Sequence, residues 1–167
     1  MIENTIKKIS DVDYTIKTIG DIDRTIEYKD GRVEDYHFKN TVLTLGRKAL
    51  VKMLTNNIGG SFNFYISKMI FGDGGTQSGV KKYVNAGRNG LFGVTRLSKP
   101  VIGIVDPSTP TQAIFTSVIK YDEAVGVTLN EMALQMANGD LYSLTTFPDL
   151  TKTDEMQITW NWRLNFV

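Results

Sequence analysis

The sequence predicts a mainly β fold, an antiparallel β-sandwich or jelly-roll-like domain with one short α-helix at about residues 44–55 and an N-terminal arm. Short segments of strand-forming residues alternate with turn signals over most of the chain. One segment has helical periodicity, and the C-terminal segment alternates strictly between apolar and polar side chains. We therefore expect an arm at residues 1–20 and a single β-rich domain at residues 21–167.

The arm carries aliphatic side chains at helical spacing, namely Ile2, Ile6, Ile9, Val12, Ile16 and Ile19. Its β-branched residues weaken a helix, and a helix of this length is marginal on its own in water. We expect a short helix or an extended arm that needs a surface to pack on. Ile2, Ile6, Ile9 and Val12 are therefore candidate interaction residues.

A hairpin is expected after the arm. Residues 22–28 and 33–38 flank Asp30-Gly31, a pair typical of a tight type I′ turn. Asp21 and Asp23 alternate along the first of these segments, as they would on a solvated strand face, and they lack the pattern of a calcium-binding loop.

The expected helix follows this hairpin. Thr41 or Thr44 can cap its N-terminus through the side-chain hydroxyl. One face would then carry the apolar residues Ala49, Leu50, Met53 and Leu54.

The remaining chain consists of short expected strands and one longer loop. Strands are predicted at residues 62–71, 91–97, 101–105, 112–121, 124–129, 134–137 and 141–147. The last two flank Asn138-Gly139-Asp140 as a second hairpin, and Pro100 and Pro110 are expected between strands. Residues 76–90 are expected to form an exposed loop, of a length at which loops are usually functional or mobile.

The C-terminal strand has the strongest pattern. Six consecutive even positions are apolar, and the odd positions between them are polar; the apolar residues are Met156, Ile158, Trp160, Trp162, Leu164 and Phe166. This pattern predicts a long strand with one buried face and one solvated face.

Composition excludes several chemistries. The 167 residues contain no Cys and one His, His37, and carry a formal charge of +1. These counts exclude disulfides, thiol nucleophiles and Cys-ligated metals, and they give no reason to expect nucleic-acid binding. No apolar run is long enough to cross a membrane, and the N-terminus lacks the apolar core of a signal peptide. We expect no cofactor, no metal and no membrane contact.

Several segments could form a binding or catalytic site, but simpler structural roles explain most of them. The Gly72–Gly75 segment can turn backbone N–H groups toward an anion, but a tight turn with positive φ explains it better. Scattered carboxylates offer only a weak case for a hydrolase: Asp73, Asp106, Asp122, Glu123 and Asp140. Four residues of the loop are candidates for binding an anion, a base or a partner protein: Lys81, Lys82, Tyr83 and Arg88. No catalytic residue is predicted, and we expect the protein not to be an enzyme.

Several motifs occur in a characteristic order: Asn40–Arg47, Met69–Thr76, Leu129–Glu131, Asn138–Leu141, Thr146–Pro148, Lys152 and Ile158–Trp160. This order resembles small virion structural proteins of tailed bacteriophages, of the tail, collar, neck or capsid-decoration type. The resemblance implies a noncatalytic subunit that forms a symmetric homo-oligomer, contacts other virion proteins, and is assembled in the cytoplasm of the host bacterium.

A carbohydrate-binding β-sandwich is the alternative. Such a module would recognise a host glycan by stacking sugars on exposed aromatic rings. The candidate aromatic residues are Tyr65, Tyr83, Phe92 and Tyr142.

Overall fold

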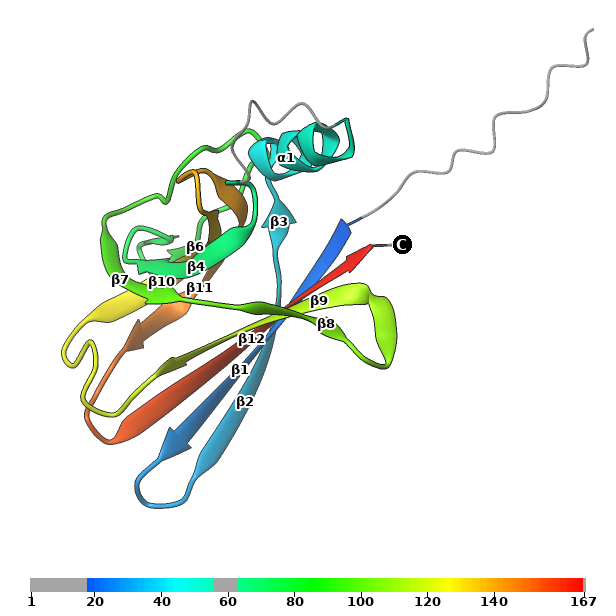
Figure 1. Cartoon of the computed structure of the whole chain (residues 1–167). Coiled ribbons are helices and arrows are strands. Elements are labelled where there is room, and N and C mark those ends of the chain that lie inside the picture. Colours follow the sequence, from blue (N-terminus) through cyan, green and yellow to red (C-terminus); the bar gives the residue numbers. More distant parts are fainter. Residues whose placement is uncertain (1–17, 56–62, 167) are drawn as a thin grey trace, which may run out of the picture.

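Two five-stranded antiparallel sheets pack face to face in the computed structural model, which describes residues 18–55 and 63–166 (Figure 1). The first sheet has the order β2 (Val33–Lys39), β1 (Thr18–Tyr28), β12 (Met156–Phe166), β9 (Thr109–Ile119) and β8 (Gly103–Asp106). The second has the order β3 (Thr41–Val42), β11 (Leu141–Thr151), β10 (Thr128–Met136), β4 (Ile66–Gly72) and β7 (Thr95–Pro100). A two-stranded hairpin, β5 (Thr76–Gln77) and β6 (Val80–Lys81), and one helix, α1 (Thr44–Leu54), complete the described chain. The predicted sandwich with one short helix is confirmed.

Strand β12 lies at the centre of the first sheet and confirms the predicted alternation. Its even positions from Met156 to Leu164 are buried, Phe166 is half-buried, and the odd positions are partly exposed. The Trp160 ring lies 5.1 Å from that of Phe147 and 5.7 Å from that of Phe71, both in the second sheet. The dry face of β12 therefore joins the two sheets.

Strand β1 starts earlier than the expected domain boundary. It pairs with β12 from Thr18, opposite Phe166, to Tyr28, opposite Met156. Residues 18–20 therefore belong to the sheet and not to the arm, because β12 offers them backbone partners. The arm residues Ile2, Ile6, Ile9 and Val12 lie outside the described residues.

Both predicted hairpins form, the first with a longer turn than expected and the second with its three-residue loop one position earlier, at residues 137–139. The first hairpin closes through the three residues 29–31, with Gly31 at φ +88° and its N–H bonded to the Tyr28 carbonyl. The second has the same arrangement, with Gly139 at φ +93°. Three-residue loops need positive φ only at the last position, and glycine supplies it.

The N-terminus of α1 is held by backbone carbonyls rather than by a threonine cap. Leu43 occupies the N-cap position without a side-chain cap bond, so the predicted caps at Thr41 and Thr44 are wrong. The N–H of Thr44 donates to the Ala86 carbonyl at 2.8 Å, and that of Leu43 donates to the Tyr142 carbonyl at 2.9 Å. Neighbouring segments therefore provide the acceptors that a cap would supply.

The apolar face expected for α1 is only partly covered. Ala49 is buried and Leu50 is half-buried, whereas Met53 and Leu54 are exposed. The helix packs closely on β11 at Gly46, where an added Cβ would lie 2.5 Å from the Tyr142 carbonyl oxygen. This contact orients the first turn of the helix and leaves its last turn uncovered.

Several predicted strand boundaries are wrong. The strands expected at residues 124–129 and 134–137 are one strand, β10, and Pro100, expected between strands, is the last residue of β7. The strand expected at residues 91–97 begins only at Thr95, and the one expected at residues 124–129 begins at Thr128, after a turn in which Ala124 has φ +51°. Pro110 lies inside β9, before the first residue that pairs with β12, so its missing N–H costs no bond to that strand.

Replacing Trp160 by alanine tests the role of β12. We expect Trp160→Ala to lower the free energy of unfolding by about 3–5 kcal/mol, because a buried ring leaves a cavity between the sheets. Thr159→Ala, on the solvated face of the same strand, is the control and should cost less than about 1 kcal/mol. Denaturant titration measures both values; equal losses would contradict the assignment of the dry face.

Candidate functional site

An apolar groove opens between the sheets beside α1, where β12 ends. Its volume is about 630 Å³, and among the described residues no charged side chain lines it. The lining comes from α1, from β4 and β8 together with the segments before them, and from the inner face of β9 and β12. It includes Leu50, Met53, Phe64, Tyr65, Ile66, Val101, Ile102, Ile104, Val105, Ala113, Phe115, Leu164 and Phe166. Figure 1 shows α1 near this end of the sandwich.

Large apolar side chains on the rim of the groove face solvent. Ile102 is 86% exposed, Val105 63% and Ile104 57%. The two isoleucines and the valine belong to β8 or precede it, and β8 is the outermost strand of the first sheet. One side of β8 therefore has no strand partner within the described chain, which is the arrangement that permits pairing with another polypeptide.

A buried carboxylate organises the glycine-rich turn on the second sheet. Glu131 of β10 is fully buried and accepts three backbone N–H bonds. Its Oε1 accepts from Gly74 at 3.0 Å and Gly93 at 2.7 Å, and its Oε2 accepts from Phe92 at 2.6 Å. The backbone N–H of Gly74, in the turn considered for binding an external anion, therefore binds the carboxylate of Glu131 instead.

The glycines of this turn serve close approach and not positive φ, so the expected left-handed turn is wrong. Positive φ occurs among the described glycines at Gly31, Gly79, Gly126 and Gly139 only. An added Cβ at Gly74 would lie 2.2 Å from the nitrogen of Gly93. Small residues are required here because two backbone segments meet above Glu131.

Asp73 fastens the same turn from outside. Its carboxylate accepts from the backbone N–H of Val94 at 3.2 Å and pairs with Arg96 at 2.5 Å. The hydrogen bond from Arg96 lowers the pKa of Asp73 below its ordinary value. Asp73 therefore holds residues 91–96 in place, which explains why the expected strand starts late.

The four loop candidates do not form one site. Lys81, Lys82 and Tyr83 line a shallow hollow of about 340 Å³ with Lys39. Arg88 instead stacks on Phe92 at 3.6 Å and donates to the Gly90 and Leu91 carbonyls. Its guanidinium is occupied by intramolecular contacts.

The segment at residues 76–90 is bound to the body at a few points. It contains β5 and β6, and Val84 is buried. The Thr146 hydroxyl donates to the Lys82 carbonyl at 2.8 Å, and the Lys82 N–H donates to the Gly75 carbonyl at 2.8 Å. The prediction of an exposed segment therefore holds for most of these residues, including Tyr83 and Val80, but the segment contains a short hairpin and is anchored at Val84 and Lys82.

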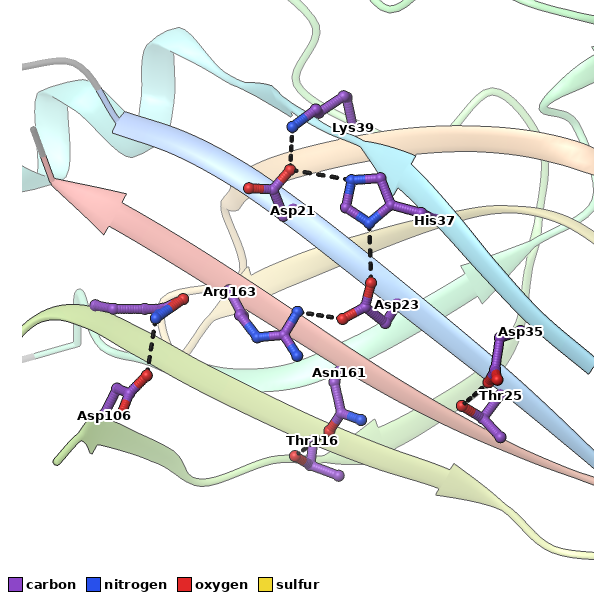
Figure 2. Close-up of polar contacts among 11 residues, drawn as sticks. Asp21, Asp23, Thr25, Asp35, His37, Lys39, Asp106, Thr116, Asn161 and Arg163 are labelled. Carbon is purple, nitrogen blue, oxygen red and sulfur yellow. Dashed lines mark hydrogen bonds and ion pairs between the residues drawn. The ribbon is translucent and has the colours of Figure 1, made fainter. Parts of the chain in front are cut away.

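The outer face of the first sheet carries a network of charged side chains (Figure 2). His37 lies between Asp23 and Asp21, with ring nitrogens 2.9 Å and 3.3 Å from their carboxylate oxygens. Lys39 pairs with Asp21, and Arg163 of β12 pairs with Asp23. This confirms the predicted solvated face at Asp21 and Asp23.

Hydrogen bonds stabilise the charged form of Asp23. Burial opposes its ionisation, but the bonds from His37 and Arg163 outweigh that effect and hold the pKa of Asp23 below its ordinary value. A hollow of about 430 Å³ lies beside this network and is lined by Asp23, Thr25, Asp35, Tyr36, His37, Asn161 and Arg163. Tyr36, which the sequence did not single out, is 42% exposed.

The four aromatic candidates for sugar stacking are dispersed. Tyr65 lines the apolar groove and is 62% exposed, and Tyr83 lines the separate basic hollow. Phe92 is half-buried beneath Arg88. Tyr142 is buried, so its selection as an exposed ring is wrong, because the close approach of α1 at Gly46 covers it.

Four of the five carboxylates that could serve in hydrolysis, Asp73, Asp106, Glu123 and Asp140, bind other groups of the protein. Asp106 accepts from the Ser108 N–H and the Gln112 amide, Glu123 pairs with Lys99, and Asp140 accepts from Asn138. Among the described residues, no group of three or more His, Asp or Glu side chains is arranged to hold a metal ion.

Comparisons with known proteins add no relatives. No family model, curated protein or solved structure matches this chain. In the described part of the chain, no helix has the length and apolar character needed to cross a membrane.

Replacing Glu131 tests the buried clamp. Glu131→Gln should lower the free energy of unfolding by about 1–3 kcal/mol, because an amide NH₂ would face a backbone N–H at a fully buried position. Glu155→Gln, at an exposed carboxylate paired with Lys29, is the control and should change stability by less than about 1 kcal/mol. Equal effects in thermal unfolding would show that the three N–H bonds contribute little.

Proposed function

We propose that this protein is a non-enzymatic structural subunit that assembles into a symmetric homo-oligomer in the virion of a tailed bacteriophage. The apolar groove carries this proposal, together with the free edge of β8 beside it. Ile102, Ile104 and Val105 expose apolar surface next to a hollow that has no charged lining. Surfaces of this kind mark sites of protein–protein contact.

The two edge strands of the first sheet differ in charge, and the less charged one is the edge beside the groove. The β2 edge carries charged side chains, including Asp35, His37 and Lys39. Charges on an edge discourage strand pairing between molecules. In β8 the only charged residue is Asp106, at its end, and Gly103-Ile104-Val105 before it are uncharged, so this edge is the one better suited to a partner.

The order of motifs supports the placement in a virion. It resembles small tail, collar, neck or decoration proteins, which implies contacts with other virion proteins as well as with identical copies. The absence of Cys suits assembly in a reducing bacterial cytoplasm.

The first test is the oligomeric state and its dependence on β8. Light scattering coupled to size exclusion should give a mass that is a multiple of 18.7 kDa, and electron microscopy should show symmetric particles. Ile104→Asp should weaken association by at least about ten-fold, because a charge would be buried at the interface.

Val33→Asp is the matched control, since Val33 is 58% exposed and lies in the other edge strand of the same sheet. It should leave the mass unchanged. A wild-type protein that stays monomeric at all concentrations, or two variants that behave alike, would contradict the proposal.

Glycan binding is the second candidate, and the polar hollow favours it. Asp35, Asn161 and Arg163 offer hydrogen-bonding groups there for the hydroxyls of a sugar. The Tyr36 ring lies on the other face of the sheet, where it stacks on Arg24 at 4.1 Å, so hydrogen bonds rather than ring stacking would carry the binding. This site differs from the aromatic residues selected from the sequence.

An array of bacterial surface glycans tests this candidate. Saturable binding should fall about ten-fold in Asn161→Ala, through loss of a hydrogen bond to the sugar. Gln157→Ala, on the same face of β12 but outside the hollow, should bind as the wild type does. An array without signal from folded protein would remove the candidate.

A further inference from the structure

We propose that the apolar groove binds the N-terminal segment, residues 1–17, of a second copy of this chain. This inference rests on the proposed self-assembly and specifies its interface. Each copy would then act as both donor of a segment and acceptor of another.

The chemistry of the segment matches that of the groove. Residues 1–17 carry an aliphatic stripe at Ile2, Ile6, Ile9, Val12 and Ile16. The groove is lined by apolar side chains and has no charge to oppose such a stripe. An amphipathic segment laid into an apolar groove is a recurrent mode of recognition.

The segment also leaves the domain next to the groove. Thr18, the first residue of β1, pairs with Phe166, and Phe166 lines the groove. Seventeen residues span about 25 Å as a helix or up to about 56 Å when extended. The stripe can therefore reach the same end of a neighbouring molecule.

The sequence before Thr18 favours a second copy over the segment's own groove. Tyr14, Thr15 and Ile16 are strand-forming residues, and residues 1–19 contain neither Gly nor Pro. Folding back from β1 into the same molecule requires a sharp reversal, for which Gly and Pro are the usual residues. In the described part of the chain, the pairing of β1 with β12 ends at Thr18, opposite Phe166.

The free edge of β8 completes the acceptor surface. Ile104 and Val105 lie at the rim of the groove and have unpaired backbone groups on one side. An arriving segment that is extended can therefore bury the even-numbered Ile2, Ile6, Val12 and Ile16 and also gain backbone hydrogen bonds. The groove alone would supply only the first of these.

The absence of Cys makes cross-linking a clean test. One set of chains carries Ile6→Cys, Ile9→Cys or Val12→Cys, one substitution per chain, and a second chain carries Val105→Cys. Equimolar mixtures are oxidised mildly, and the products are separated without reductant. We expect a disulfide-linked heterodimer for at least one position of the segment, identified by the mass of the joined peptides.

The control acceptor carries Val33→Cys, which is similarly exposed but lies in β2. It should yield roughly ten-fold less heterodimer, because only docking raises the effective concentration of the two thiols. Equal yields from the two acceptors would overturn the inference, since random collision would explain them.

A doubly substituted chain, Ile9→Cys with Val105→Cys, shows whether the segment binds the groove of its own chain or that of a second copy. If it closes only within one monomer and the mixtures give no heterodimer, the segment occupies its own groove and the inference is wrong. If no cross-link forms while the oligomer persists, the inference fails and the proposed function stands. If the protein is monomeric, both fail.

Discussion

The contact between Trp160 of β12 and the rings of Phe71 and Phe147 supports most of the other features. It joins the two sheets across the core, and β12 is also the strand between β1 and β9. Through β1, strand β12 holds the point at which residues 1–17 join the sheet. Through β9 it holds β8 and one wall of the groove. Large buried aromatic rings provide much of the energy of such a core. The donor and acceptor sides of the proposed interface are thus built on one strand.

Two buried charges fix loops that the core does not reach. Glu131 collects three backbone N–H groups, and Lys152, also fully buried, donates from Nζ to the Tyr121 carbonyl at 2.9 Å and the Thr153 carbonyl at 2.6 Å. Burial lowers the pKa of Lys152. A buried charge is costly unless hydrogen bonds satisfy it. Both side chains therefore commit loop backbone to one arrangement, so the segments around them do not behave as free loops.

The sequence predicted elements whose pattern is local. Alternation from Met156 to Phe166 and the glycines at Gly31 and Gly139 indicated the last strand and both hairpins, because side-chain period and turn chemistry act over a few residues. The groove was not predicted, since it depends on which strand becomes the edge of a sheet. Nor was the role of Gly74, whose neighbour Gly93 is distant in sequence. Exposure of Ile104 and burial of Tyr142 likewise follow from long-range packing.

The positions of donor and acceptor constrain the symmetry of the proposed assembly. The segment leaves β1 at Thr18, and the groove opens at the same end of the sandwich, beside Phe166. Reciprocal exchange between two copies uses the same surfaces on both, so it closes as a two-fold dimer. In a larger ring, each copy would donate its segment to the next copy and receive one from the copy before it. The reach of residues 1–17 then limits how far apart neighbouring copies can lie. In either arrangement the charged outer face of β1, β2 and β12 points away from the groove and stays open to other partners.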